Sequence, residues 1–414
     1  MVIKHKILND PVYGFINMPS GINYDLVEHS WFQRLRHIRQ LGLAFYVYPG
    51  AIHSRFQHSI GAHYLTLLAI DVIRSKGFRI SEEEAQAVST AILLHDIGHG
   101  PFSHTLENSL VINVSHETLS ELFMEALNKI HKGRLSLAVE IFKNRYKKKF
   151  LHQLVSSQLD MDRLDYLKRD SYFTGVSEGV IGSDRIIKML NIVNDNLVVD
   201  EKGIYSIEKF LIARRLMYWQ VYLHKTVLSS EQMLIRIFDR ARELYLNRKD
   251  PETSQNVRYF LSNSFTEDDF RSNDSLLSRF ACLDDNDLLS TVKNWTNSSD
   301  KVLSLLCSRF MNRQIFKIEM QNEPFSKDRI EEYKQKIVKK FRISESEATS
   351  FVFADSAKNH AYSAHDDRIN ILLKTNELVD ISEASDMLNI QVLSKNVVKY
   401  FFCYPEECRV RNKS

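Results

Sequence analysis

The stretch from Ile207 to Leu246 contains neither glycine nor proline, and its apolar residues recur with the period of an α-helix. One break is expected near Ser229. The whole chain is equally poor in helix breakers, with 13 glycines and 7 prolines among 414 residues. These counts correspond to about 3% and 2%, against usual frequencies of about 7% and 5%. The sequence therefore predicts a mainly α-helical fold.

Periodicity and capping signals predict further helices. We expect them over 27–42, ended by Gly42; 59–75; 81–94, opened by a capping box of Ser81 and Glu84; 118–129, capped by Ser115; and 151–175, broken near Ser156. Short hairpins are expected near residues 12–16 and over 192–207.

The pattern changes after residue 312. Strands are predicted at IFKIEM (315–320), SFVFAD (350–355), INILLK (369–374) and KYFFCYP (399–405), with a helix over Lys327–Phe341. The predicted architecture is a helical domain over 1–315, with its chemical core at about 50–225, and a small α+β domain over 316–414. The second domain is expected to serve oligomerisation or regulation.

Several classes of protein are excluded. No run approaches the ~18 apolar residues of a membrane span, and the first residues do not resemble a secretory signal. Four scattered cysteines are too few for a disulfide framework, so a reduced, cytoplasmic setting is expected. The net charge of +3 gives no global reason to bind nucleic acid. The basic stretch KNRYKKK (143–149) favours a solvated surface, with nucleic-acid contact as the minority alternative.

Histidines are concentrated in one region, because seven of the 15 lie within residues 53–116. The segment LLHDIGHGPFSH (93–104) places His95 and Asp96 at the end of an apolar helix, before a glycine-rich loop. Further along, Asp162, Tyr166 and Asp170 are spaced to share one helix face. The alternative for that helix is an exposed acidic surface paired with neighbouring cations.

Two imidazoles and two carboxylates form a ligand set suited to a divalent Fe, Mn, Zn, Co or Ni ion, and less to Ca or Mg. Such an ion lowers the pKa of a bound water, so that hydroxide is available near neutral pH. Arg55, Arg163 and Arg214 would supply the planar cationic groups that bind phosphate.

The residues His58, His95–Asp96 and Asp162 resemble the H…HD…D motif of HD-domain phosphohydrolases. Five segments are more narrowly similar to the deoxynucleoside triphosphate (dNTP) triphosphohydrolases of that superfamily: FQRLRHIRQLG (32–42), YPGAIHSRFQHSIG (48–61), LLHDIGHGPFSH, DMDRLDYLKRD (160–170) and YLHK (222–225). The resemblance covers roughly residues 5–315. It implies an HD-domain helical bundle and one transition-metal ion, with additional Mg or Mn accompanying the nucleotide phosphates.

The resemblance also implies a role for each matched residue. The metal ligands would be His58, His95, Asp96 and Asp162, and the acid–base groups His99, His116 and Glu117. The substrate residues would be Arg55, His104, Arg163, Tyr166 and Arg214 for the phosphates, and Gln40, Leu41, Tyr166, Asp170 and Tyr222 for the sugar. Gln33 and Arg36 resemble residues that bind an activating GTP or dGTP, although Glu28 stands where that site usually has an aspartate. Arg163 replaces a lysine of the vertebrate enzymes.

In that family a metal-activated water attacks the α-phosphorus of a dNTP and releases deoxynucleoside and triphosphate. The resemblance therefore predicts this reaction, carried out by a homo-oligomer, either dimer or tetramer. Two alternatives stay open. The first is an HD phosphohydrolase that acts on another nucleotide or on a phosphomonoester, and the second is a non-catalytic nucleotide sensor or nucleic-acid-binding module.

Overall fold

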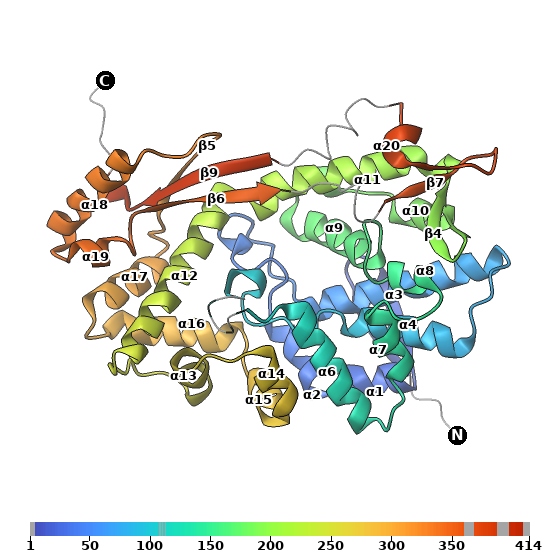
Figure 1. Cartoon of the computed structure of the whole chain (residues 1–414), viewed down its shortest axis with the longest axis horizontal. Helices are drawn as coiled ribbons and strands as arrows, with labels where there is room; N and C mark the ends of the chain where they lie inside the picture. The colour runs from blue at the N-terminus through green and yellow to red at the C-terminus, as the bar shows by residue number, and fades with distance from the viewer. Residues whose placement is uncertain are drawn as a thin grey trace.

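The computed structural model describes residues 5–106, 109, 111, 113–359, 368–386 and 397–408. Helices dominate these residues, which confirms the predicted mainly α fold (Figure 1). The α-helices up to residue 217 are α1 (Ile22–Glu28), α2 (Ser30–Gln33), α3 (Arg55–Ser75), α4 (Glu82–Leu94), α6 (His116–Ile130), α7 (Ser136–Phe142), α8 (Lys149–Gln153), α9 (Met161–Thr174), α10 (Ser183–Met189) and α11 (Ile204–Met217). They are followed by α12 (Lys225–Leu246), α13 (Gln255–Ser262), α14 (Glu267–Ser272), α15 (Asp274–Phe280), α16 (Asp285–Asn294), α17 (Lys301–Met311), α18 (Lys327–Phe341), α19 (Glu345–Ala348) and α20 (Ile381–Ala384).

The remaining elements are strands and short helical turns. The strands are β1 (His5–Asp10), β2 (Gly14–Pro19), β3 (Leu190–Val193), β4 (Asn196–Asp200), β5 (Lys317–Gln321), β6 (Phe353–Asn359), β7 (Asn370–Leu372), β8 (Leu378–Asp380) and β9 (Val397–Tyr404). The 3₁₀ turns are η1 (Arg34–His37), η2 (Ala44–Tyr46), η3 (Ser103–Leu106), η4 (Ser177–Gly179), η5 (Glu201–Gly203), η7 (Trp295–Asn297) and η8 (Glu406–Cys408), and η6 (Tyr218–Tyr222) is a π-helix.

Helix α3 packs against both α4 and α9, and local sequence signals set the ends of these helices. The Gln57 side chain accepts a hydrogen bond from the Ser54 amide and closes the capping box that begins α3. The predicted box of Ser81 and Glu84 begins α4. Helix α9 ends at Gly175, whose φ of 74° is a left-handed conformation that glycine adopts easily.

The predicted single helix over 27–42 is wrong. His29 adopts an extended conformation, with φ −68° and ψ 138°, and its Nδ1 accepts the amide of Trp31. This side chain therefore ends α1 and caps α2 by satisfying a free amide at the helix start. The chain then passes through η1 into a loop in which the Gln40 amide donates to the carbonyl of His53. As a result, Gln40 and Leu41 are presented from a loop and not from a helix.

The break in the segment 207–246 was expected near Ser229, but it lies earlier. A π-helix follows α11 directly, and α12 begins after His224, whose Nδ1 accepts the amide of Thr226. Ser229 remains inside α12, because its hydroxyl donates to the carbonyl of Phe316 and so does not compete with the helix backbone.

The residues after 315 contribute to two separate sheets. Strands β5, β9 and β6 form an antiparallel sheet in the order β5-β9-β6 at one end of the molecule (Figure 1). At the other end, β7 pairs in parallel with β4, with Val199 opposite Ile371, in the sheet β3-β4-β7-β8. A strand from the predicted second domain thus completes a sheet that begins in the helical body. The division at residue 315 stays a prediction.

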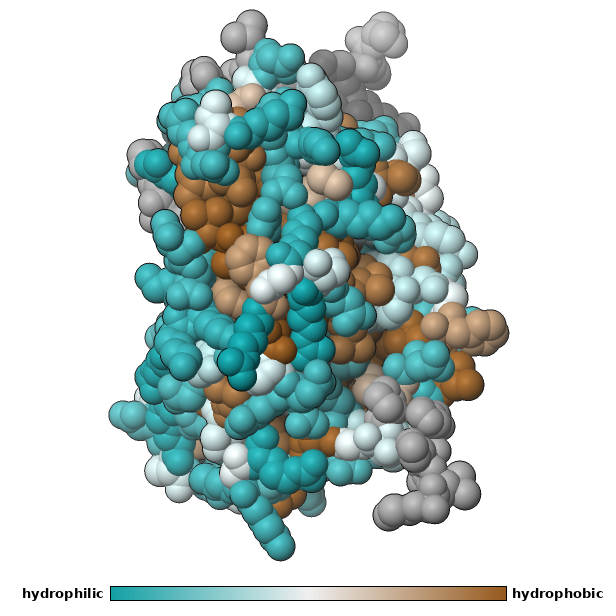
Figure 2. All heavy atoms as spheres, turned by 90° about the vertical axis from the view of Figure 1, so that its right-hand side faces the viewer, coloured by the Kyte–Doolittle hydropathy of each residue, from teal (hydrophilic) through white to brown (hydrophobic). Residues whose placement is uncertain are grey.

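Hydrophilic residues cover most of the face shown in Figure 2, with hydrophobic areas between them. Among the described residues, no helix is both long and apolar enough to cross a membrane. In the basic stretch 143–149, Lys143 forms ion pairs with Glu121 and Glu125, and Lys148 with Glu84. Both lysines therefore have intramolecular acidic partners, and nucleic-acid contact by this stretch stays a prediction.

Candidate metal centre and substrate cavity

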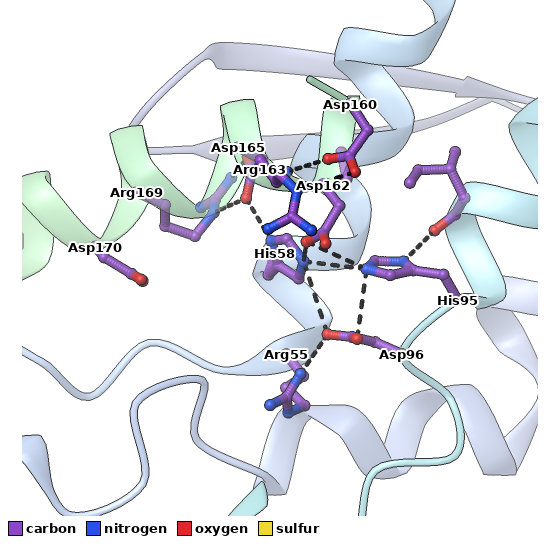
Figure 3. A network of polar contacts seen from close by, with 12 residues as sticks. Arg55, His58, His95, Asp96, Asp160, Asp162, Arg163, Asp165, Arg169 and Asp170 are labelled. Carbon is purple, nitrogen blue, oxygen red and sulfur yellow. Dashed lines mark hydrogen bonds and ion pairs between the residues drawn. The ribbon is translucent and has the colours of Figure 1, made fainter. Parts of the chain in front are cut away.

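Four potential metal ligands converge where α3, α4 and α9 meet (Figure 3). His58 lies in the first turn of α3, His95 and Asp96 directly follow α4, and Asp162 lies in the first turn of α9. The Nε2 atom of His58 is 3.3 Å from Nε2 of His95 and 3.0 Å from Oδ1 of Asp162. Oδ1 of Asp96 is 3.4 Å from Nε2 of His95.

These separations fit one bound ion. Ligand atoms about 2.1 Å from a transition-metal ion lie about 3.0 Å apart at a right angle and about 3.4 Å apart at the tetrahedral angle. The ligand atoms of His58, His95 and Asp162 all lie within 4.8 Å of one another, and Asp96 faces the same point. The structure thus brings together three of the predicted ligands, His58, His95 and Asp162. The fourth, Asp96, lies 3.7 Å from His58 Nε2 and 3.4 Å from His95 Nε2 through its two oxygens. Two imidazoles and carboxylates in this arrangement suit a divalent transition metal.

The outer nitrogens of both histidines are held in the way a metal site requires. Nδ1 of His95 is 2.6 Å from the carbonyl of Ile92, which can only accept a hydrogen bond, so this nitrogen carries the proton. Nδ1 of His58 is 2.7 Å from Oδ2 of Asp165. In the neutral rings, both Nε2 lone pairs are therefore directed at the common point, as in many metal sites.

The electrostatics of the cluster call for a cation. Burial alone would raise the pKa of Asp162, but hydrogen bonds from His58 and His95 hold it well below the ordinary value. Burial alone would lower the pKa of His58, but Asp162 and Asp165 raise it to about 10. The converging carboxylates therefore bind positive charge strongly, and a divalent metal ion would meet the same demand.

A buried chain of charges supports His58 from behind, and the sequence analysis missed its members. Asp165 accepts two hydrogen bonds from Arg169, at 2.9 and 3.0 Å, in addition to its contact with His58. Arg169 also donates to Asp10 at the end of β1. Gly61 leaves room for this ion pair, because a Cβ there would lie 2.0 Å from Asp165 and 2.2 Å from Arg169.

The spacing of Asp165 and Arg169 at i and i+4 was the available signal for this network. The sequence also left open an exposed acidic surface paired with neighbouring cations, which would explain the same spacing. That alternative is excluded, since Asp165, Arg169 and Asp170 are all buried.

A cavity of about 720 Å³ opens beside the metal ligands. It is lined by every predicted phosphate- or sugar-binding residue whose side chain is described, namely Gln40, Leu41, Arg55, Arg163, Tyr166, Asp170, Arg214 and Tyr222. The predicted acid–base residues His99, His116 and Glu117 line it as well. The side chain of His104, on η3, lies outside the described part of the structure.

The two histidines predicted to act in acid–base catalysis lie together near Asp96. The rings of His99 and His116 are 3.9 Å apart between centroids, and Nδ1 of His99 is 3.3 Å from Oδ1 of Asp96. Burial, together with the charge of Arg55, lowers the pKa of His99 well below its ordinary value. His99 is thus neutral near pH 7. Nε2 of His116 is 3.2 Å from a carboxylate oxygen of Glu117.

Asp170, which also lines the cavity, is fixed by two neighbours. Its carboxylate accepts the Tyr222 hydroxyl at 2.8 Å and lies 2.8 Å from Nε2 of His53. Phe173 stacks on the ring of His53. Tyr222 belongs to the π-helix, a distortion that frequently marks functional sites in helical proteins. Two of the predicted sugar-binding residues, Asp170 and Tyr222, are therefore held by hydrogen bonds, and His53 supports Asp170.

Asp285, at the start of α16, ties two cavity loops together. One of its oxygens accepts the amide of Arg39 at 3.0 Å, and the other accepts the amide of Phe102 at 2.7 Å. Phe102 and Ser103 both have a φ of 53°, which is unfavourable for residues with side chains. Asp285 therefore helps to hold a strained turn directly before His104. No motif in the sequence indicated this role.

Comparison with known proteins agrees with this geometry. The family model described as HD domain matches residues 55–170, and the one described as HD associated region matches residues 181–259. A phosphohydrolase from Bacteroides thetaiotaomicron, known from a crystal structure, is 54% identical in sequence to this chain, with a TM-score of 0.93. The match covers 97% of this chain and 100% of the Bacteroides chain. The chain belongs to the HD-domain phosphohydrolases.

Two further relatives have lower sequence identity. Uncharacterized protein YwfO of Bacillus subtilis is 34% identical over 320 residues, which are 76% of this chain and 71% of YwfO. A Dictyostelium discoideum protein named deoxynucleoside triphosphate triphosphohydrolase SAMHD1 homolog is 31% identical over 255 residues, which are 57% of this chain and 49% of that protein.

The two predicted activator residues of this HD phosphohydrolase do not line the cavity. The Gln33 amide donates to the carbonyl of Val27 at 2.6 Å, and its oxygen accepts Nε of Arg36 at 2.8 Å. The guanidinium of Arg36 stacks over the ring of Phe56. Activator binding by Gln33 and Arg36 stays a prediction.

Proposed function

We propose that this HD phosphohydrolase cleaves dNTPs to deoxynucleoside and inorganic triphosphate. The observation that carries the proposal is the cavity itself, where cationic residues form one group of lining side chains beside the metal ligands and tyrosines with an aspartate form another. A polyphosphate needs the first region, and a sugar hydroxyl suits the second. The name of the Dictyostelium relative supports the same reaction.

The arrangement of the arginines favours a polyanion. Arg214 is 6% exposed, and burial lowers the pKa of its guanidinium, with the charge of Arg163 adding to the decrease. Only one hydrogen bond of the Arg214 side chain is present among the described residues, to Gln158 at 2.9 Å, and its Nε has no partner there. Arg214 is buried and the neighbouring Arg163 is half-buried, so phosphate oxygens that bind between these two cations would stabilise both.

Arg55 acts closer to the metal ligands. Its Nη1 donates to Asp96, and its Nε donates to the Ser103 hydroxyl at 2.8 Å. It therefore fixes the orientation of a metal ligand while its remaining donors face the cavity. The triphosphate would extend from Arg55 toward Arg163 and Arg214, which places the α-phosphorus beside the ligand cluster.

When bound, a divalent ion would supply a polarised water for attack on the α-phosphorus. That water would add to phosphorus, the bond from phosphorus to the sugar 5′-oxygen would break, and the proton lost by the water would be balanced by one gained at that oxygen. His116 and Glu117 line the cavity near the ligands and can pass protons to and from these atoms. His99 is neutral and is held by Asp96, and it would help to orient the substrate in the same part of the cavity.

Asp170 can accept a hydrogen bond from the sugar 3′-hydroxyl while Tyr222 and His53 hold it in place. Gln40 and Leu41 line the same cavity from their loop, where they would crowd a 2′-hydroxyl and so favour deoxynucleotides.

The test is incubation of each dNTP with purified protein and Mn²⁺, followed by separation of the products. We expect deoxynucleoside and triphosphate, and no turnover by a His95→Ala/Asp96→Ala variant. A dNDP or dNMP product would contradict the proposed reaction. Turnover of a phosphomonoester, with none of any dNTP, would select the alternative substrate class. Repeating the assay with added GTP or dGTP tests whether an activator is needed. Measuring the molar mass of the protein in solution tests whether it is a dimer or a tetramer.

A further inference from the structure

Glu231 lines the substrate cavity, although none of the steps described above uses it. It lies on α12, and one of its carboxyl oxygens accepts the Thr105 hydroxyl at 3.1 Å. The other oxygen has no hydrogen-bond partner among the described residues, and no lysine or arginine there forms an ion pair with Glu231. A carboxyl group in this position has acceptor capacity that is still available to a ligand.

The surroundings of Glu231 are apolar. Val227, one turn earlier on α12, lines the same cavity and packs with Ala44 and Leu41. Helix α12 also packs against η3, which carries Thr105. Gly42 faces this contact, since a Cβ at Gly42 would lie 3.9 Å from the Thr105 hydroxyl. The result is an apolar wall with one carboxyl group, unlike the arginines that line the cavity with the metal ligands.

The charge of each wall decides which part of a nucleotide it can receive. The triphosphate belongs with Arg55, Arg163 and Arg214, and a carboxylate would repel it. Burial raises the pKa of Glu231 to about 7, with only the Thr105 hydroxyl opposing the rise, so the arginines do not compensate its charge. The sugar is bound by Asp170 and Tyr222. The nucleobase is the remaining part of the substrate, and it has both a flat apolar face and N–H donors.

We propose that Glu231 recognises the base of the substrate and that it selects guanine, an inference that rests on the proposed function. Guanine presents two adjacent donors, N1–H and the 2-amino group, which match the two oxygens of one carboxylate. Adenine and cytosine present one amino group beside an acceptor, and thymine presents one N–H between two carbonyls. Thr105 orients the carboxylate, and the wall formed by Leu41, Ala44 and Val227 covers the face of the base.

The test compares wild type with Glu231→Gln on dGTP, dITP and dATP, with saturating GTP present so that an activator site is filled throughout. dITP lacks the 2-amino group and isolates that contact. For wild type we expect kcat/KM to favour dGTP over dATP by about tenfold or more, with dITP between them. The ratio should fall toward one in Glu231→Gln. Glu243→Gln, at an exposed site on the same helix, is the matched control and should keep the wild-type ratio.

Binding measured by calorimetry on metal-free protein separates this inference from the proposed reaction. If no dNTP is hydrolysed but dGTP still binds more tightly than dATP, and Glu231→Gln removes the difference, base recognition stands and the reaction fails. Equal wild-type affinity for dGTP and dATP, a preference for another base, or a dGTP preference that survives Glu231→Gln would overturn the inference. Failure of wild type to bind any of these nucleotides in this assay, together with no turnover of any dNTP in the presence of Mn²⁺, would overturn both.

Discussion

Replacement of Asp165 by asparagine isolates the contribution of the residues behind the metal centre. The carboxylate of Asp165 faces three donors, one from His58 and two from Arg169. Asparagine keeps one oxygen, and its amide NH₂ would oppose a donor on His58 or on Arg169. His58 then loses the acceptor that fixes its orientation. Loss of such an outer contact typically lowers metal affinity by about 10- to 100-fold, or about 1.4–2.7 kcal/mol.

Calorimetric titration of metal-free protein with Mn²⁺ and with Co²⁺ measures this loss directly. Asp10→Asn is the matched control, because Asp10 binds Arg169 at 2.7 Å but does not contact His58. Both variants should lower the free energy of unfolding by about 1–3 kcal/mol, since each leaves Arg169 with fewer acceptors. Only Asp165→Asn should weaken metal binding. Equal metal affinity in Asp165→Asn and wild type, or an equal loss in Asp10→Asn, would refute the reasoning.

Three further predictions follow from packing and charge. Gly61→Ala should lower the free energy of unfolding by about 1–3 kcal/mol in urea titrations and should also weaken Mn²⁺ binding, because the added Cβ would displace Asp165. Unchanged stability would contradict the close approach of α3 and α9. Asp285→Asn should lower kcat without changing metal affinity, since asparagine keeps one oxygen and either the Arg39 loop or the turn before His104 loses its acceptor; a normal kcat would show that both loops hold themselves. Burial alone would raise the pKa of Glu84, but Lys148 and Tyr146 lower it from 4.5 to about 2, so its stabilisation is present above pH 4.5 and is lost as the pH falls toward 2. Glu84→Gln should therefore cost about 2–3 kcal/mol at pH 6 and progressively less down to pH 3, and a cost independent of pH would count against this ion pair.

The sequence was informative wherever a local signal decides the structure. The Ser81–Glu84 capping box and the termination at Gly175 were predicted because adjacent residues determine both. The helix over 27–42 was predicted wrongly because apolar spacing continues through His29, where a side chain binding to the next amides breaks the backbone pattern. The π-helix at Tyr218–Tyr222 was missed for a related reason, since one extra residue in a turn leaves the apolar pattern almost unchanged.

The candidate site divides in a similar way. His58, His95, Asp96 and Asp162 were predicted because their order matches a family motif. Asp285 acts on backbone amides far away in sequence, and no side-chain pattern reports such contacts. Glu231 was read only as part of an apolar helix, because its exposure to the cavity depends on how α12 is packed.

The parallel pairing of β4 with β7 has a consequence for shortened forms of this protein. A chain that stopped at residue 315 would lack β7 and β8, and one side of β4 would present unsatisfied amide and carbonyl groups beside the buried Val198 and Val199. An open strand edge of this kind recruits strands from other molecules. We therefore expect truncated preparations to self-associate through β4, so that their particle size would report an exposed edge and not the native assembly.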